Sequence, residues 1–243
     1  MNFNISVFAY KYMELTPKEK IRGLILPKKI TPNLAYFCGV LAGDGSISYR
    51  KKKSEYEIKC VGNPRNEREY YDFIIKDLVK ELFNLEIFPR EYDKGVTYGF
   101  RIWSKNMVKY LTEFIGLPLG KKYEHLAIPR IFLQNKSLVR NFISGVADTD
   151  FHLAIKKRNN YPVIMGCSKS KIFMEEIKSF LEEEGFKVCI YQRNDFDKRV
   201  NKAVITHRIE LSGRRQLRRW LQYIGFRHPK YNSKINIFQE GFD

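Results

Sequence analysis

Long apolar runs and paired cysteines are both missing from this 243-residue sequence. No apolar stretch approaches the ~20 residues that a membrane-spanning helix needs, and residues 1–4 lack the basic and apolar regions of a signal peptide. The four cysteines are scattered without a CxxC pair, and the four histidines show no ligand spacing. These absences argue against a membrane span, a disulfide framework and a zinc site. They predict a reducing compartment, either the prokaryotic cytoplasm or an organelle matrix.

Acidic residues are too few to balance the basic ones. The chain has 44 Lys and Arg against 27 Asp and Glu, which gives a net charge of +17. Such a field favours polyanionic partners, either nucleic acid or an anionic membrane surface. The sequence shows no basic amphipathic helix with aromatic anchors, so nucleic acid is the expected partner and a membrane is not.

Two stretches of the chain share one pattern. Residues 34–47 read LAYFCGVLAGDGSI and residues 138–153 read LVRNFISGVADTDFHL, and without a gap Asp44 aligns with Asp150. Each stretch predicts a mostly apolar helix that ends at an Asp and passes into a strand. A carboxylate at a helix C-terminus costs a few tenths to about 1 kcal/mol. Two equivalent ones indicate a bound cation, and Mg²⁺ prefers such hard oxygen ligands.

Small residues predict that these two helices touch. Gly39 and Gly43 are four apart and share a face, and Gly145 and Thr149 are the matching small residues of the second copy. A crossing there would bring the two carboxylates side by side. For one copy alone, a buried helix that ends at a glycine explains the pattern equally well. Two copies in register favour a paired metal site.

Both stretches resemble the LAGLIDADG motif of the homing endonucleases. The first is close to the family pattern, whereas the second has Phe151 where the family usually has Gly. The resemblance covers residues 32–235. It implies a free-standing, intron-encoded monomer of pseudo-twofold symmetry, with the two motif helices at its axis.

The rest of the chain reads as an internal duplication. The predicted strands are 46–50, 56–61, 85–92 and 96–104 in the first half, and 151–157, 161–167, 186–193 and 203–212 in the second. The predicted helices are 66–83, 105–115, 170–184 and 215–224, and a charged loop spans 194–202. We expect an α+β fold in which two αββαββα units form two four-stranded antiparallel sheets and a DNA-binding saddle. The predicted divisions are a basic extension 1–30, a first half 31–116, a linker 117–137, a second half 138–235 and a tail 236–243. A helix start in the extension is predicted at Thr16, with Pro17 and Glu19 in its first turn.

Strand alternation predicts which side chains face away from the helices. The residues expected inside are Val96, Tyr98, Phe100, Ile102, Ile205, Ile209 and Leu211, with Thr97 facing out. The candidate DNA-contacting residues are Ser48, Arg50, Lys52, Lys59, Arg90, Arg101, Trp103, Lys156, Arg158, Tyr191, Arg193, Thr206, Arg208 and Glu210. One at a time, each is explained by an ordinary solvated strand. Together with the net charge they favour DNA, since a β-ribbon fits the major groove.

The family resemblance also implies a mechanism. It implies that Asp44 and Asp150 bind two or three Mg²⁺ ions, with Mn²⁺ as a substitute, helped by the backbone carbonyls of Gly43 and Thr149. It implies one cut per strand across the minor groove of a long, weakly palindromic site, with short 3′ overhangs. The family places basic residues around the metals, and the candidates are Lys169, Lys121 and Lys230. Asn63 stands where the first half would carry the counterpart of Lys169.

Three other functions are possible for a chain with this fold. An intron RNA maturase would use the fold to bind RNA, and a DNA-binding regulator would keep the fold without cleavage. The third is the endonuclease block of an intein. No separate helix-turn-helix pattern supports the regulator, and no splicing segments surround the motifs as in an intein. The leading hypothesis is therefore a metal-dependent DNA endonuclease that acts as a monomer, because the duplication places both halves of the site on one chain.

Overall fold

The computed structural model describes residues 14–122, 125–156, 160–197 and 201–239. Its strands form two four-stranded antiparallel sheets, which confirms the predicted fold class. The first sheet has the order β1-β2-β4-β3, and its strands are β1 Gly45–Arg50, β2 Glu55–Gly62, β3 Arg90–Tyr92 and β4 Thr97–Trp103. The second has the order β5-β6-β8-β7, and its strands are β5 Phe151–Lys156, β6 Tyr161–Ser168, β7 Cys189–Asp197 and β8 Lys202–Ser212.

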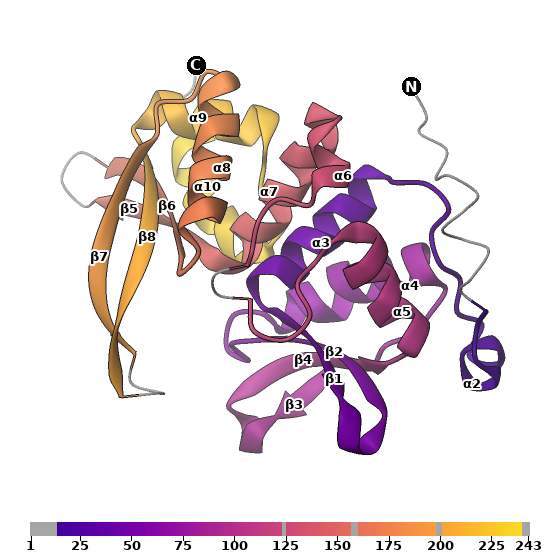
Figure 1. The fold of residues 1–243 in the computed structure, drawn as a ribbon. Helices are drawn as coiled ribbons and strands as arrows, with labels where there is room; N and C mark the ends of the chain where they lie inside the picture. Colours follow the sequence, from indigo (N-terminus) through magenta and orange to yellow (C-terminus); the bar gives the residue numbers. More distant parts are fainter. Residues whose placement is uncertain (1–13, 123–124, 157–159, 198–200, 240–243) are drawn as a thin grey trace.

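Helices cover one face of each sheet and leave the other face open (Figure 1). The two motif helices, α3 Pro32–Gly43 and α7 Lys136–Asp150, lie at the centre. Around them are α4 Lys76–Phe83 after the π-helical turn η2 Tyr70–Ile75, α5 Lys105–Lys109 before the π-helical turn η4 Tyr110–Ile115, α8 Lys171–Glu183, α9 Arg214–Tyr223 and α10 Asn232–Gln239. The short helices are α2 Pro17–Ile21, α6 Arg130–Leu133, η1 Lys51–Lys53, η3 Asp93–Gly95 and η6 Pro229–Tyr231. Buried side chains from both halves form one continuous hydrophobic cluster, so the halves pack as one body. Within the described ranges, no helix has the length and apolar character that crossing a bilayer requires.

Glycines set the distance between the motif helices. A Cβ added to Gly39 would lie 2.0 Å from the carbonyl oxygen of Phe142, and one added to Gly145 would lie 2.1 Å from that of Tyr36. These two contacts are equivalent under the duplication. The predicted crossing is therefore confirmed, and it depends on backbone-to-backbone contact that no larger residue permits.

Side-chain caps start α2 and α3, and the cap of α2 lies at Thr16 as the sequence predicted. The Thr16 hydroxyl accepts a hydrogen bond from the backbone N–H of Glu19, and the Glu19 carboxylate accepts one from the backbone N–H of Thr16. Thr31 caps α3 by accepting from the N–H of Leu34 at 3.1 Å. Because these hydroxyls satisfy backbone donors that have no partner in the first turn, they fix where each helix begins.

Several predicted boundaries were wrong. The strand 85–92 is reduced to β3, because Pro89 has no N–H to donate, although Leu85 and Ile87 are still buried. The charged loop 194–202 is largely strand, since β7 continues to Asp197 and β8 begins at Lys202. This longer hairpin extends past the helices, so Ile205 is 51% exposed instead of inside. Val96 precedes β4 and is 70% exposed, and α10 occupies much of the predicted tail.

Candidate active site between the two halves

Asp44 and Asp150 meet at the bottom of the helix crossing. Asp44 caps the C-terminus of α3 and Asp150 is the last residue of α7. A Cβ added to Gly43 would lie 3.4 Å from the carboxyl carbon of Asp150. Both carboxylates line a cleft of about 630 Å³, to which both sheets contribute, with Thr97 from β4 and Thr206 from β8. The duplication therefore delivers one carboxylate from each half into a common space.

Burial makes these two carboxyl groups hard to ionise. It raises the pKa of Asp44 to about 7, and repulsion by Asp150 and Glu67 adds to the effect despite the nearby Lys230 and Lys122. Burial also raises the pKa of Asp150 to about 6, although the same two lysines oppose it. A bound divalent cation would favour both ionised forms. The described residues contain no group of three or more His, Cys, Asp or Glu arranged around a metal. Two carboxylates fit Mg²⁺, which takes its remaining ligands from carbonyls, water or phosphate.

Two equivalent lysines bind the ends of the motif helices. The Nζ of Lys122 donates to the carbonyl of Ala42 at 2.9 Å and also to that of Gly43. The Nζ of Lys230 donates at 2.6 Å to the carbonyl of Asp148, which is the counterpart of Ala42. Each ammonium satisfies carbonyls at the negative end of a helix dipole. The structure thus places positive charge symmetrically beside the two carboxylates.

The first of these lysines is the neighbour of the one expected. Lys121 is exposed, whereas Lys122 lines the cleft. A signal for the correct register was present, because residues 122–123 and 230–231 both read Lys-Tyr. Lys122 also contacts the Gly43 carbonyl that was predicted as a metal ligand.

Comparisons with known proteins show which sequences and folds this chain is similar to. A sequence model of the LAGLIDADG-like domain matches residues 137–225. Homing endonuclease I-ApeI of Aeropyrum pernix is 28% identical over 210 residues, which is 84% of this chain and 85% of that protein. The fold matches I-DmoI in complex with DNA and Ca, with a TM-score of 0.58 and 19% identity over 86% of this chain and 98% of that one. The second half of the chain thus matches the LAGLIDADG-like domain, and most of the chain is similar to a homing endonuclease.

Two further matches show how much of this chain is similar to known proteins. An uncharacterized protein of Methanocaldococcus jannaschii is 25% identical over 177 residues, which is 68% of this chain. The match spans only 60% of that relative's length. The structure of I-WcaI bound to its DNA recognition sequence aligns with 93% of this chain and 96% of that one, with a TM-score of 0.56 and 13% identity. The similarity of fold thus extends over both halves.

The departure from the LAGLIDADG pattern at Phe151 is accommodated by its cross-strand partner. In the first half Gly45 pairs with Cys60, and in the second Phe151 pairs with Gly166. A Cβ on Gly166 would lie 2.2 Å from the Phe151 ring, whose centroid is 6.0 Å from that of Trp220. The large residue and the glycine have exchanged strands, so the ring fills the space that Gly166 leaves.

Glu67 is a site residue that the sequence did not reveal. It is buried, its Oε1 lies 3.6 Å from the Nζ of Lys230, and its charge contributes to the raised pKa of both Asp44 and Asp150. The backbone N–H of Asn63 donates to it at 2.8 Å. No motif marks this residue, because an acidic side chain at the start of a helix is common. Its position became evident only from the folded chain.

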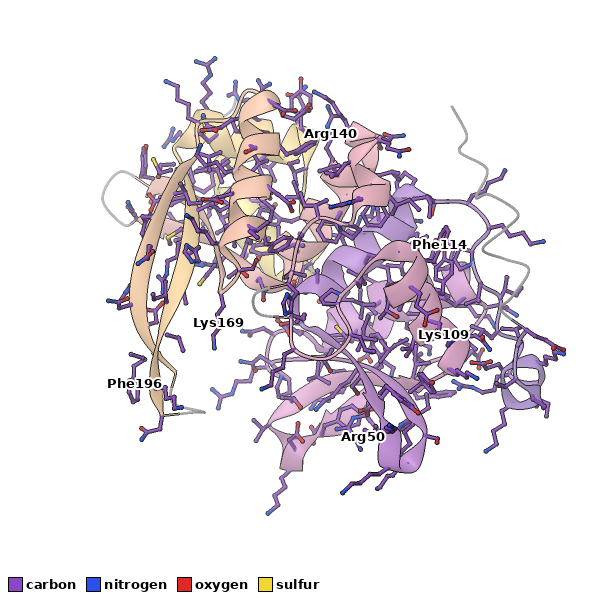
Figure 2. All side chains as sticks on the ribbon, viewed as in Figure 1. Arg50, Lys109, Phe114, Arg140, Lys169 and Phe196 are labelled. Carbon is purple, nitrogen blue, oxygen red and sulfur yellow. The ribbon has the colours of Figure 1, made fainter. Side chains whose placement is uncertain are left out.

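The two halves differ in the residue that follows their second strand. Lys169 lines the central cleft and lies between the two sheets in Figure 2. Asn63, its counterpart by sequence, lines a neighbouring cleft of about 580 Å³ together with Glu67 and Lys230. The predicted equivalence therefore holds in sequence position but not in the space that each side chain reaches.

The open sheet faces carry the predicted basic residues, mostly paired with carboxylates. Glu57 lies 3.1 Å from Arg50 and 3.6 Å from Arg101. Asp195 lies 2.8 Å from Arg208 and 3.2 Å from Arg193. Figure 2 shows Arg50 on the first-half hairpin and Phe196 near the tip of the second-half hairpin. These acidic partners hold the long basic side chains in place on the open faces of the two sheets.

The remaining DNA-contact candidates divide by position. The cross-strand register puts Ser48, Lys59 and Trp103 on the open face of the first sheet. It puts Lys156, Tyr191 and Glu210 on the open face of the second sheet. Lys52 lies in the turn η1, and Arg90 is exposed on the edge strand β3. Thr206 is buried, not exposed as predicted, because its hydroxyl donates to Asp195 at 2.5 Å. Arg158 lies outside the described residues.

Proposed function

We propose that this chain is a site-specific DNA endonuclease that cuts both strands of a long duplex site with divalent metal ions. The observation that carries the proposal is the pair Asp44 and Asp150, which reach one cleft from the two halves of a duplicated chain. Two open sheet faces with basic side chains lie on either side of that cleft. Relatives support the proposal, because I-ApeI is named a homing endonuclease and I-DmoI has been crystallised with its target DNA in Mn, Mg and Ca.

Each site residue has a role in this proposal. Asp44 and Asp150 would hold two or three Mg²⁺ or Mn²⁺ ions, with the carbonyls of Gly43 and Thr149 as further oxygen donors. Ions bound there supply an activated water and stabilise the charge that develops on the phosphate. Because burial raises the pKa of both carboxyl groups, a cation held between them would favour their ionised forms.

The lysines act on the DNA rather than on the metal. Lys122 and Lys230 stand beside the two carboxylates and would offset the charge of the two scissile phosphates, one for each strand. Lys169 faces the cleft from the second half and would contact a phosphate there. From the family resemblance we expect one cut in each strand across the minor groove, short 3′ overhangs and a weakly palindromic target. One chain holds both halves of the site, so the active species is a monomer.

Cleavage of a randomised duplex library in Mg²⁺ tests this proposal. Wild-type protein should select one long site and cut both strands, while Asp44→Asn and Asp150→Asn should each abolish double-strand cutting and retain binding. Sequencing of the cut ends reports the overhang. If wild-type protein binds duplex DNA tightly and never cuts it, the endonuclease proposal fails and a DNA-binding regulator replaces it. Preferential binding of structured RNA without cutting would favour an intron maturase.

A further inference from the structure

A basic groove lies at one end of the first sheet, outside the central cleft. It has a volume of about 660 Å³ and runs between α2, the turn η1 and the end of β4. Its cationic side chains are Lys18 and Arg22 from the extension, Lys53 from the turn and Lys105 at the start of α5. We refer to it as the α2 groove.

The part of the extension that forms one wall of this groove, α2 and the residues after it up to Leu26, is firmly anchored. Glu19 of α2 is only 4% exposed, and its carboxylate accepts hydrogen bonds from Ser104 Oγ at 2.5 Å and from the N–H of Asn106 at 2.9 Å. Arg22 donates to the carbonyl of Trp103 at 3.0 Å. Leu24 and Leu26 then enter the common core. The wall is thus part of the folded first half, and Arg22 is held in position on it.

The charges of the α2 groove are largely uncompensated. Lys18, Lys53 and Lys105 are exposed, and none of them takes part in an ion pair between residues that the structure describes. Glu55 also lines the groove but lies 3.5 Å from Arg50. The basic residues of the sheet faces, by contrast, mostly have carboxylate partners. Three lysines without such partners suit phosphate groups, which need positive charge and no fixed geometry.

The position of the groove continues the DNA face. Trp103 lines it and also lies on the open face of the first sheet, in register with Glu57 of β2. Figure 1 shows α2 on the outer side of the first half, away from the central helices. A duplex lying on the open sheet faces would leave the first sheet at this end. The groove therefore meets the flank of the target and not its centre.

The second half offers no such wall among its described residues. The segment that precedes its motif helix forms α6, and Phe132 of α6 packs on Phe142 of α7, with ring centroids 5.7 Å apart. The corresponding end of β8 is followed directly by Gly213 and α9. Any backbone contact made by the α2 groove must then be one-sided.

We propose that the α2 groove binds the DNA phosphate backbone beyond the bases that the first sheet contacts, and so extends the footprint on one flank only. The inference rests on the proposed function, because it requires a DNA target. It assigns the N-terminal extension to target binding and leaves the cutting step to the central cleft. It makes an otherwise pseudo-symmetric protein bind a longer half-site on one side.

The test compares two triple variants of the full chain with wild type. The groove variant carries Lys18→Ala, Lys53→Ala and Lys105→Ala, and it leaves the anchoring residues Glu19 and Arg22 unchanged. The matched control carries Lys76→Ala, Lys80→Ala and Lys109→Ala, which removes the same charge from α4 and α5 on the covered face of the same sheet. Each protein is bound, in EDTA, to the duplex that wild type cleaves. Its hydroxyl-radical footprint and salt dependence of binding are then measured, and circular dichroism checks its fold.

Wild type and control should protect one flank further than the other, and the groove variant should lose that extra protection alone. Its slope of log K against log[salt] should become shallower by about 2.7, because each lost phosphate contact removes about 0.9. Identical footprints and slopes for the groove variant and wild type overturn the inference and leave the endonuclease proposal standing. Equal loss of protection on both flanks also overturns it. Failure of wild type to bind or cut any duplex overturns both proposals.

Discussion

At the residue scale, the difference between Lys121 and Lys122 shows how much chemistry depends on one position. Both are basic and both follow the last helix of the first half, so composition and spacing do not separate them. The fold does, because only Lys122 donates to the carbonyls that end α3. Glu67 makes the same point, since its proximity to the two aspartates follows from the packing of the first half and not from any motif.

This difference gives a matched pair of variants. Lys122→Ala should lower the rate of double-strand cleavage by two orders of magnitude or so, the size of effect seen when one charge-stabilising donor is lost. Lys121→Ala removes the same charge from an exposed position and should cleave like wild type. Single-turnover cleavage rates at saturating Mg²⁺ measure both. Equal rates for the two variants would show that Lys122 only caps α3.

A second prediction at this scale concerns acid stability. Burial alone would raise the pKa of Glu19, but hydrogen bonds from Ser104, Asn106 and Thr16 outweigh it and lower the pKa from 4.5 to about 2. A carboxyl group whose pKa is lower in the folded than in the unfolded protein stabilises the folded state fully at pH values above its unfolded pKa. This contribution is lost as the pH falls through the folded pKa. The loss should therefore develop between pH 4.5 and about 2.

The difference in unfolding free energy between wild type and Glu19→Gln isolates this contribution. Urea unfolding at pH 6 should show the variant less stable by about 1.5–3 kcal/mol, the usual worth of hydrogen bonds to a charged group. The gap should narrow toward pH 2. A gap that is constant across this range would mean that the Gln side chain disturbs the fold by its shape, and the assignment to ionisation would be wrong.

At the scale of elements, periodicity and repetition gave most of the fold correctly. The two motif helices and the central strands follow from alternation, capping residues and a gapless repeat, whereas the order of the strands within each sheet was not predicted. The errors lie where a local pattern has two physical outcomes. Residues 85–89 of the predicted strand 85–92 alternate like a strand yet lack a ladder because of Pro89. The charged residues 194–202 look like a loop but lengthen a hairpin. Ion pairs such as those of Asp195 stabilise that hairpin, and they are visible only once β7 and β8 pair.

The packing of α3 on α7 supplies the prediction at this scale. Gly39→Ala and Gly145→Ala each place a methyl group near 2 Å from a backbone carbonyl oxygen of the other helix. Overpacking of this kind costs about 1–3 kcal/mol, and it should also separate the two carboxylates and reduce cleavage. Ser137→Ala on the exposed side of α7 is the control and should be neutral. Thermal unfolding and cleavage assays measure both effects, and a variant that loses activity at full stability would show that geometry alone is at issue.

At the scale of the whole molecule, the duplication has produced two halves that share a central site but differ around it. Both halves supply a carboxylate and a lysine to the centre, and this symmetry was legible in the sequence apart from the one-residue shift. Lys169 and Asn63 face different clefts, and only the first half carries α2. In the pair Gly45–Cys60 the glycine lies on the first strand of its half, whereas in the pair Phe151–Gly166 it lies on the second. These asymmetries arise from contacts across strands and between distant segments, which a single sequence does not display. They predict a target whose two halves are read by different side chains.

Because both carboxylates stand on one chain, the site should work only within a single molecule. A mixture of Asp44→Asn and Asp150→Asn proteins should therefore cut no better than either alone, since no chain in the mixture holds both aspartates. Wild-type cleavage rates should rise linearly with protein concentration, and sedimentation on DNA should give one 28.9 kDa chain per duplex. If two copies instead joined to build a shared site, as single-motif subunits would, mixing would restore activity. Restored double-strand cutting would then assign the functional site to an interface between chains and make the contact between α3 and α7 purely structural.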